Sequence, residues 1–171
     1  LEYVDGKIVV DEITPKDRFG KIFKNSSKHP SHSMGKSIIS YIAGHAICKG
    51  YISGISHKLN DWPILEKTLF YNQPLINPLN MASGDYKYIK TKGGGEFKNS
   101  KRWVNNPSIQ SIMENEMKNT TAAKSKYSYS NLNTNLVGSY VLYKMGHKDF
   151  KKMLNEIFVD KVGIEYDMII K

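Results

Sequence analysis

The apolar side chains between Met34 and Lys49 recur at intervals of three and four residues, and this pattern constrains the fold more than any other. Such spacing places the apolar side chains on one face of an α-helix, and that face must pack against a partner. Gly50 follows directly, and a glycine there commonly ends a helix because it adopts positive φ without strain. We therefore predict a helix over residues 34–49 with one buried face.

Weaker signals predict the rest of the architecture. Asp5-Gly6 stands between two β-rich runs, which predicts a two-residue hairpin within residues 1–13. Residues 84–107, which contain three consecutive glycines, are predicted to form a surface loop. A two-stranded ribbon is not stable alone in water, so the helical part must supply the core. Further helices are expected over residues 64–70, 75–81, 108–118, 132–145 and 150–161.

The composition is that of one globular domain. The chain has 171 residues, of which 40% are hydrophobic and 24% charged, and these are ordinary values for a single folded domain. Cys48 is the single cysteine, which excludes a disulfide within the chain and a multi-cysteine zinc site. The 5 histidines are dispersed, and we predict neither a metal nor a cofactor. No apolar run approaches the roughly 18 residues that cross a bilayer.

The net charge of +9 arises from 25 Lys+Arg against 16 Asp+Glu. Basic residues neutralise phosphates, so a nucleic-acid partner is one interpretation. The lysines are scattered from Lys7 to Lys171, however, and only Arg18 and Arg102 offer the bidentate fork typical of phosphate-reading surfaces. We expect a solvated surface and no nucleic-acid partner. A basic interaction protein, with lysines clustered on one face, is kept as an alternative.

Ser33-Met34-Gly35-Lys36 has the form S-x-x-K. At a helix start, positions i and i+3 share a face, so hydroxyl and amine can meet. A serine hydroxyl is a weak nucleophile until a base takes its proton, and a helix N-terminus favours developing negative charge. A serine N-cap beside an exposed lysine is the alternative interpretation. Gly35-Lys36-Ser37 also ends like a phosphate-binding loop, but Pro30 replaces a required glycine and excludes that function.

Tyr129-Ser130-Asn131 stands directly before the helix predicted over residues 132–145. A tyrosine beside a lysine ammonium ionises more easily than free phenol, whose pKa is about 10. At roughly 4 Å and an effective dielectric near 20, the attraction is about 4 kcal/mol before desolvation reduces it. A Lys–Tyr pair is thus a credible proton shuttle for serine. The alternative is that Tyr129 is a packed aromatic residue and Asn131 a helix N-cap.

In this order, the two motifs resemble the serine β-lactamase and penicillin-binding-protein superfamily. The stretch 32–50, continuing to Ile52, is similar to the family's nucleophile helix and its exit. Residues 75–84 resemble its LLxMxSG segment, and residues 129–138 its YSNxxxxLLG helix start, with a similar following helix over 150–165. Tyr-x-Asn resembles the class C β-lactamase, esterase and D-aminopeptidase side. The S-M-x-K-S form and Asn133-Thr134-Asn135 resemble 6-aminohexanoate-dimer hydrolases.

This resemblance implies an α+β, β-lactamase/DD-peptidase-like fold and a serine hydrolase that needs no cofactor. It makes Ser33 the acylated nucleophile, with Lys36 assisting its deprotonation. Tyr129 would pass protons to the leaving group and later from water, and Asn131 would hold Lys36 and the substrate. The Ser33 backbone N–H would be one of two oxyanion donors. The implied substrate is a small amide, ester or peptide. A periplasmic or secreted location is implied, with a cytoplasmic one left open.

The family's third motif, K-T-G or H-x-G on a sheet strand, does not occur after Asn131. That strand supplies the second oxyanion N–H, and losing one donor costs roughly 100- to 1000-fold in rate. We therefore expect residues 1–171 to be a truncated domain, its N-terminal and helical part, with little activity of its own. A non-catalytic penicillin-binding-like module that recognises a peptide or cell-wall fragment is a further alternative. It predicts that Ser33, Lys36 and Tyr129 do not converge.

Overall fold

The computed structural model describes residues 2–10, 32–89 and 108–164. The chain divides into two compact units, Leu1–Ser33 and Met34–Lys171, and each is described by itself. In the first unit, β1 (Glu2–Val4) and β2 (Lys7–Val10) pair in antiparallel fashion. Asp5 and Gly6 form the turn with φ of 50° and 76°. Positive φ at both turn residues suits a tight hairpin, so the hairpin predicted from Asp5-Gly6 is confirmed.

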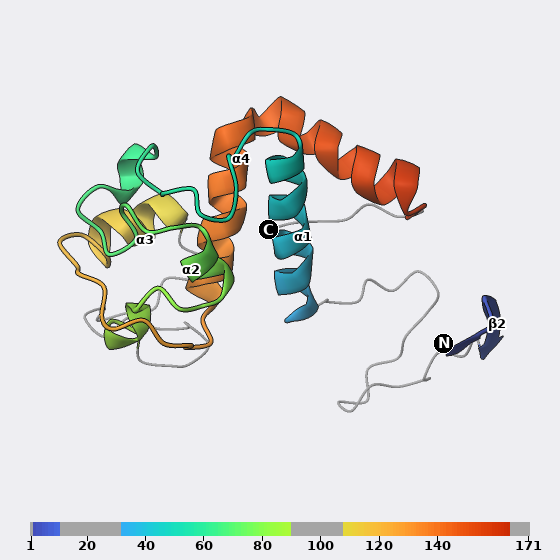
Figure 1. The fold of residues 1–171 in the computed structure, drawn as a ribbon, viewed down its shortest axis with the longest axis horizontal. Coiled ribbons are helices and arrows are strands. Elements are labelled where there is room, and N and C mark those ends of the chain that lie inside the picture. The colour runs from blue at the N-terminus through green and yellow to red at the C-terminus, as the bar shows by residue number, and fades with distance from the viewer. Residues whose placement is uncertain (1, 11–31, 90–107, 165–171) are drawn as a thin grey trace. The chain divides into compact units, whose positions relative to one another are not determined.

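The second unit consists mainly of helices, and α1 and α4 lie side by side in it (Figure 1). Together with the hairpin, this content is compatible with the α+β class. The four α-helices of the described residues are α1 (Met34–Cys48), α2 (Ile76–Leu79), α3 (Ile109–Asn115) and α4 (Asn131–Leu154). Shorter elements are the 3₁₀-helices η1 (Pro63–Leu65) and η2 (Asp85–Lys87) and the π-helix η3 (Asn155–Lys161).

Helix α1 confirms the helix predicted over residues 34–49. Its buried face carries Ile42, Ala43 and Ala46. Gly50 has φ of 82°, and the Tyr51 N–H donates to the Ala46 carbonyl at 3.0 Å. This hydrogen bond closes the helix around a left-handed glycine, as the sequence predicts.

Helix α4 contains a sharp bend at Gly146, where φ is 75° and ψ is 160°. The two helices predicted over residues 132–145 and 150–161 are therefore both present, joined at this glycine and continuing into η3. The N-cap of α4 is Ser130, whose hydroxyl accepts from the Leu132 N–H at 3.1 Å. The alternative that Asn131 is the N-cap is therefore wrong, and its side chain is available for another contact.

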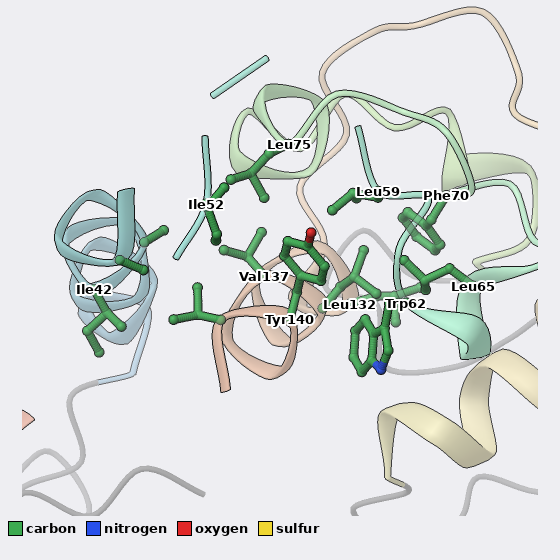
Figure 2. Packing of buried hydrophobic residues seen from close by; sticks show 14 of the residues in the cluster. Ile42, Ile52, Leu59, Trp62, Leu65, Phe70, Leu75, Leu132, Val137 and Tyr140 are labelled. Carbon is green, nitrogen blue, oxygen red and sulfur yellow. The ribbon is translucent and has the colours of Figure 1, made fainter. Parts of the chain in front are cut away.

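The core lies between α1, α4 and the segment that joins α1 to α2. Figure 2 shows Ile42 on α1 and Val137 and Tyr140 on α4, and all three belong to the same buried cluster. Each fully buried side chain of this size stabilises the fold by about 1.5–3 kcal/mol. The joining segment contributes the buried residues Ile52, Leu59, Trp62, Leu65, Phe70 and Leu75.

The helix predicted over residues 64–70 is wrong beyond its first turn. Only η1 forms, after which Lys67 takes a φ of 61°. The Thr68 hydroxyl donates to the Leu65 carbonyl at 2.7 Å. Side-chain bonds of this kind offer the backbone an alternative to helix. The apolar residues Leu69 and Phe70 are buried from turns, which periodicity alone does not distinguish from a helix.

The surface loop predicted over residues 84–107 is wrong at its beginning. Gly84 is buried, Asp85 is fully buried within η2, and Ile89 also lies in the core. This segment packs against the chain that leads into α4, so its burial depends on contacts distant in sequence. Residues 90–107 lie outside the described residues.

Candidate functional site

Lys36 and Asn131 meet although 95 positions separate them in the sequence. Lys36 lies in the first turn of α1, and Asn131 is the first residue of α4. The Lys36 Nζ donates to the Asn131 Oδ1 at 2.6 Å. A hydrogen bond from a charged donor is shorter and stronger than one between neutral groups. The packing of α1 against α4 therefore brings the lysine of S-x-x-K to the asparagine of Tyr-x-Asn.

Tyr129 completes this cluster. The Lys36 Nζ lies 4.8 Å from the centre of the Tyr129 ring, which is within the range of a cation–π contact. Both side chains are half-buried. Three of the predicted site residues, Lys36, Tyr129 and Asn131, are thus brought together within the second unit.

Ser33 is exposed and directly precedes Met34, the first residue of α1. It is the last residue of the first unit. A residue at this place stands at the N-terminal end of a 15-residue helix, where the helix dipole favours negative charge. The roles that the resemblance implies for the Ser33 hydroxyl and backbone N–H stay predictions.

The chain that leads into Tyr129 is held along residues 81–88. The Ser128 N–H donates to the Met81 carbonyl at 2.9 Å, and the Ala123 N–H donates to the Gly84 carbonyl at 3.1 Å. Gly84 has φ of 74°, and a Cβ there would lie 2.4 Å from the Ala123 carbonyl oxygen. Only glycine permits this close approach. The segment similar to the family's LLxMxSG motif therefore supports the segment that carries Tyr129.

A buried polar network links the same segment to α4. The Asn133 Nδ2 donates to the Asp85 Oδ2 at 2.9 Å, and the Ser83 hydroxyl donates to the Asn133 Oδ1 at 2.7 Å. Burial raises the pKa of the Asp85 carboxyl, while interactions with Ser130 and Asn133 act in the opposite direction. Sequence reasoning missed Asp85, because nothing in its local sequence predicts that α4 buries it.

A second polar cluster connects α4 to the segment before η1. The Tyr140 hydroxyl donates to the Asp61 Oδ1 at 2.7 Å, so its oxygen is free to accept from the His57 Nε2, also at 2.7 Å. The Lys144 Nζ donates to the Asp61 Oδ2 at 2.5 Å. Burial acts to raise the pKa of Asp61, but hydrogen bonds from Lys144 and Tyr140 outweigh it and lower that pKa. This cluster fastens the joining segment to α4.

A small recess opens beside the Lys36 cluster. Residues of α1, α2 and α4 line it together with Met81, and most of the lining is apolar. Its lining residues are Lys36, Ile39, Ser40, Pro78, Leu79, Met81, Thr134 and Val137. The Lys36 side chain therefore contributes both to this recess and to the contacts with Asn131 and Tyr129.

Other residue types weighed in the sequence do not assemble a site in the described part of the chain. Cys48 is exposed and unpaired in a disulfide. His45 is half-buried, with its ring 4.6 Å from that of Tyr41. Within residues 2–10, 32–89 and 108–164, no group of three His, Cys, Asp or Glu side chains could hold a metal ion. None of the helices in these ranges is both long and apolar enough to span a membrane.

No protein-family model, curated protein or solved structure matches the chain. The site is therefore defined by its own geometry, in which Lys36, Tyr129 and Asn131 meet at the starts of α1 and α4. The likeness to serine β-lactamases rests on the motifs in the sequence.

Proposed function

We propose that this chain belongs to a β-lactamase-related serine hydrolase that cleaves an amide or ester bond through a Ser33 acyl-enzyme. The observation that supports the proposal most is the contact of Lys36 with Asn131 and Tyr129. These residues come from the two motifs on which the resemblance rests. An S-x-x-K sequence that occurred by chance would not be expected to place its lysine against a Tyr-x-Asn sequence 95 positions away.

In this mechanism, the Ser33 hydroxyl attacks the carbonyl carbon of the substrate and forms a tetrahedral intermediate. The proton of the hydroxyl passes to the Lys36–Tyr129 pair, which delivers it to the departing amine or alcohol. In this scheme the proton-accepting role belongs to the Tyr129 hydroxyl group, with the Lys36 amine 4.8 Å from the centre of the Tyr129 ring as the neighbouring positive charge. Water then attacks the carbonyl carbon of the acyl-enzyme and gives a proton to the same pair. The bond between this carbon and the Ser33 Oγ breaks as the pair returns the proton to Ser33, and the carboxylic acid leaves.

Asn131 has a positioning role in this scheme. Its amide oxygen accepts from the Lys36 Nζ and so restricts the position of a long, flexible side chain. A proton-transfer group must lie within hydrogen-bond reach of its partner, and small displacements reduce the rate strongly. Asn131 also has two amide N–H donors, and in this scheme they donate to the substrate.

Labelling with a fluorophosphonate probe tests this function in the protein expressed from the whole gene that contains this chain. We expect the labelled peptide to contain Ser33, and Ser33→Ala to abolish labelling. Lys36→Ala should slow labelling about 100-fold or more, the range for loss of a general base. Ser37→Ala removes another exposed serine of α1 and is the matched control, with labelling unchanged. A folded protein that is not labelled, or is labelled elsewhere, would overturn the proposal.

A further inference from the structure

We propose that Asp85 is a positioning residue of this site: through Asn133 it holds the first turn of α4, and thereby places Tyr129 and Asn131 around Lys36. This inference rests on the proposed function for its catalytic meaning. Its geometric part concerns Asp85, which lies outside the sequence motifs, and Asn133 and Ser83, to which the resemblance assigns no role. Asp85, Asn133 and Ser83 act together in it.

Hydrogen bonds join Asp85 and Ser83 directly to Asn133 in the first turn of α4. Asp85 and Asn133 are both 0% exposed, and Ser83 is 1% exposed. Asn133 uses both ends of its amide, donating to the Asp85 carboxylate and accepting from the Ser83 hydroxyl. Asn133 lies in the same helical turn as Asn131, so its attachment fixes that turn. Buried groups of this kind cannot exchange their partners for water, and losing one is costly.

The hydrogen bonds among Asp85, Asn133 and Ser83 depend on the direction of their donors and acceptors, whereas the apolar contacts of the core do not. Hydrophobic contacts are non-directional, so they tolerate small rotations of α4 about its axis. A hydrogen bond between an amide and a carboxylate weakens steeply when its geometry changes. The Asp85–Asn133 bond therefore restricts the rotation of the first turn of α4 about the helix axis. This restriction keeps Asn131 in the position from which it contacts Lys36.

Asp85 is a buried carboxyl with polar partners at the start of α4. The Asn133 Nδ2 donates to its Oδ2, and an interaction with Ser130 also opposes the effect of burial on the pKa of the carboxyl. An apolar side chain at this place would avoid the cost of burying a carboxyl. It would not supply the directional bond to the first turn of α4.

The motif is held on both sides by the same segment. Ser128, directly before Tyr129, is bonded to Met81 through the backbone. Asn133, two positions after Asn131, is bonded to Asp85 and Ser83. Residues 81–85 therefore hydrogen-bond to the chain directly before Tyr129 and two positions after Asn131.

A spectroscopic signature tests this placement without any turnover. The Lys36 amine lies over the Tyr129 ring, so the ring current should move the proton signal of the Lys36 ε-methylene upfield. We would record lysine ε-methylene signals by NMR, and assign this one by its loss in Lys36→Arg. Asn133→Asp places a second carboxylate against Asp85, and the upfield shift should disappear. The double variant D85N/N133D recreates one amide–carboxylate pair, and the shift should return.

The rate of Ser33 labelling, measured on the same variants, tests whether this placement of Tyr129 and Asn131 affects catalysis. Asn133→Asp should slow labelling about 30-fold or more, and the double variant should recover to within about threefold, since charge-assisted bonds of this strength control such factors. Tyr140→Phe breaks the other polar cluster of α4 and is the matched control. It should lower stability while leaving the Lys36 signal and the labelling rate of the folded protein unchanged.

Two further variants keep the test decisive if Asn133→Asp does not fold. Asp85→Asn keeps an oxygen acceptor for Asn133 and should preserve the Lys36 signal, whereas Asp85→Ala should lose it. An unchanged Lys36 signal in both Asn133→Asp and Asp85→Ala would overturn the positioning role. If the unsubstituted protein is never labelled at Ser33, the proposed function fails, while the NMR signal still decides whether Asp85 places Tyr129 and Asn131 around Lys36.

Discussion

Lys36 and Asn131 form a 2.6 Å hydrogen bond between the first turns of two different helices. The bond requires α1 and α4 to lie close together. Gly138 of α4 permits this, because a Cβ at that position would lie 3.2 Å from the Ile39 Cδ1 of α1. The two helices also share the core through Ile42 and Val137 (Figure 2). The polar contact at the site is thus a consequence of apolar packing one and two turns away.

Asn131→Ala should separate the catalytic from the structural role of this bond. Because Asn131 is exposed, its loss should change the free energy of unfolding by less than about 1 kcal/mol. Labelling of Ser33 should slow about 10- to 100-fold, since the Lys36 amine loses a charge-assisted bond. Asn135→Ala, an exposed asparagine one turn later in α4, is the control and should label normally. Equal labelling by both variants would contradict a role for Asn131.

Gly84→Ala should destabilise the protein by about 2–4 kcal/mol in urea unfolding, from its left-handed backbone and from overpacking. The added methyl would meet the Ala123 carbonyl oxygen at 2.4 Å, and that oxygen belongs to the backbone and cannot rotate away. Gly50→Ala is the matched control, because Gly50 also has positive φ but has open space around it. It should cost only about 1–2 kcal/mol. Equal losses would show that the close approach at Ala123 contributes nothing.

Tyr140→Phe should destabilise the protein by about 1–3 kcal/mol, because it leaves partners in a half-buried cluster unsatisfied. The lost hydroxyl lies between the Asp61 carboxylate and the His57 ring, each at 2.7 Å. Tyr143→Phe removes a hydroxyl that donates to the Asp61 backbone carbonyl from an exposed position. That control should cost about 1 kcal/mol or less. Urea unfolding of both variants measures the difference, and a Tyr143→Phe loss as large as that of Tyr140→Phe would contradict this account.

The parts of the fold that were predicted correctly are those with a local signal. The hairpin depends on Asp5-Gly6, and α1 on its periodicity and Gly50. The segment after η1 was predicted wrongly, because the bond from Thr68 to Leu65 and the burial of Leu69 depend on turns that periodicity does not reveal.

The site shows the same division. Lys36, Tyr129 and Asn131 could be named because they belong to short motifs. Asp85 and Asn133 could not be paired, since 48 positions separate them and only the packing of α4 brings them together. Ser130 took the N-cap in place of Asn131, a choice between neighbours that backbone geometry decides.

Asp61 should give the protein a stability that disappears in acid. Its pKa is lowered in the folded state, so the ionised form is the one that folding favours. The stabilisation is then fully present above the unfolded-state pKa of about 3.9, and is lost as the pH falls through the lower folded-state value. Urea unfolding between neutral and strongly acidic pH measures this loss. Asp61→Asn should be less stable at neutral pH and should lose less stability on acidification.

Lys144→Met, which removes a cation bonded to the Asp61 carboxylate, should reduce the acid-dependent loss in the same direction. Curves for the three proteins that run parallel over the whole range would contradict this role of Asp61.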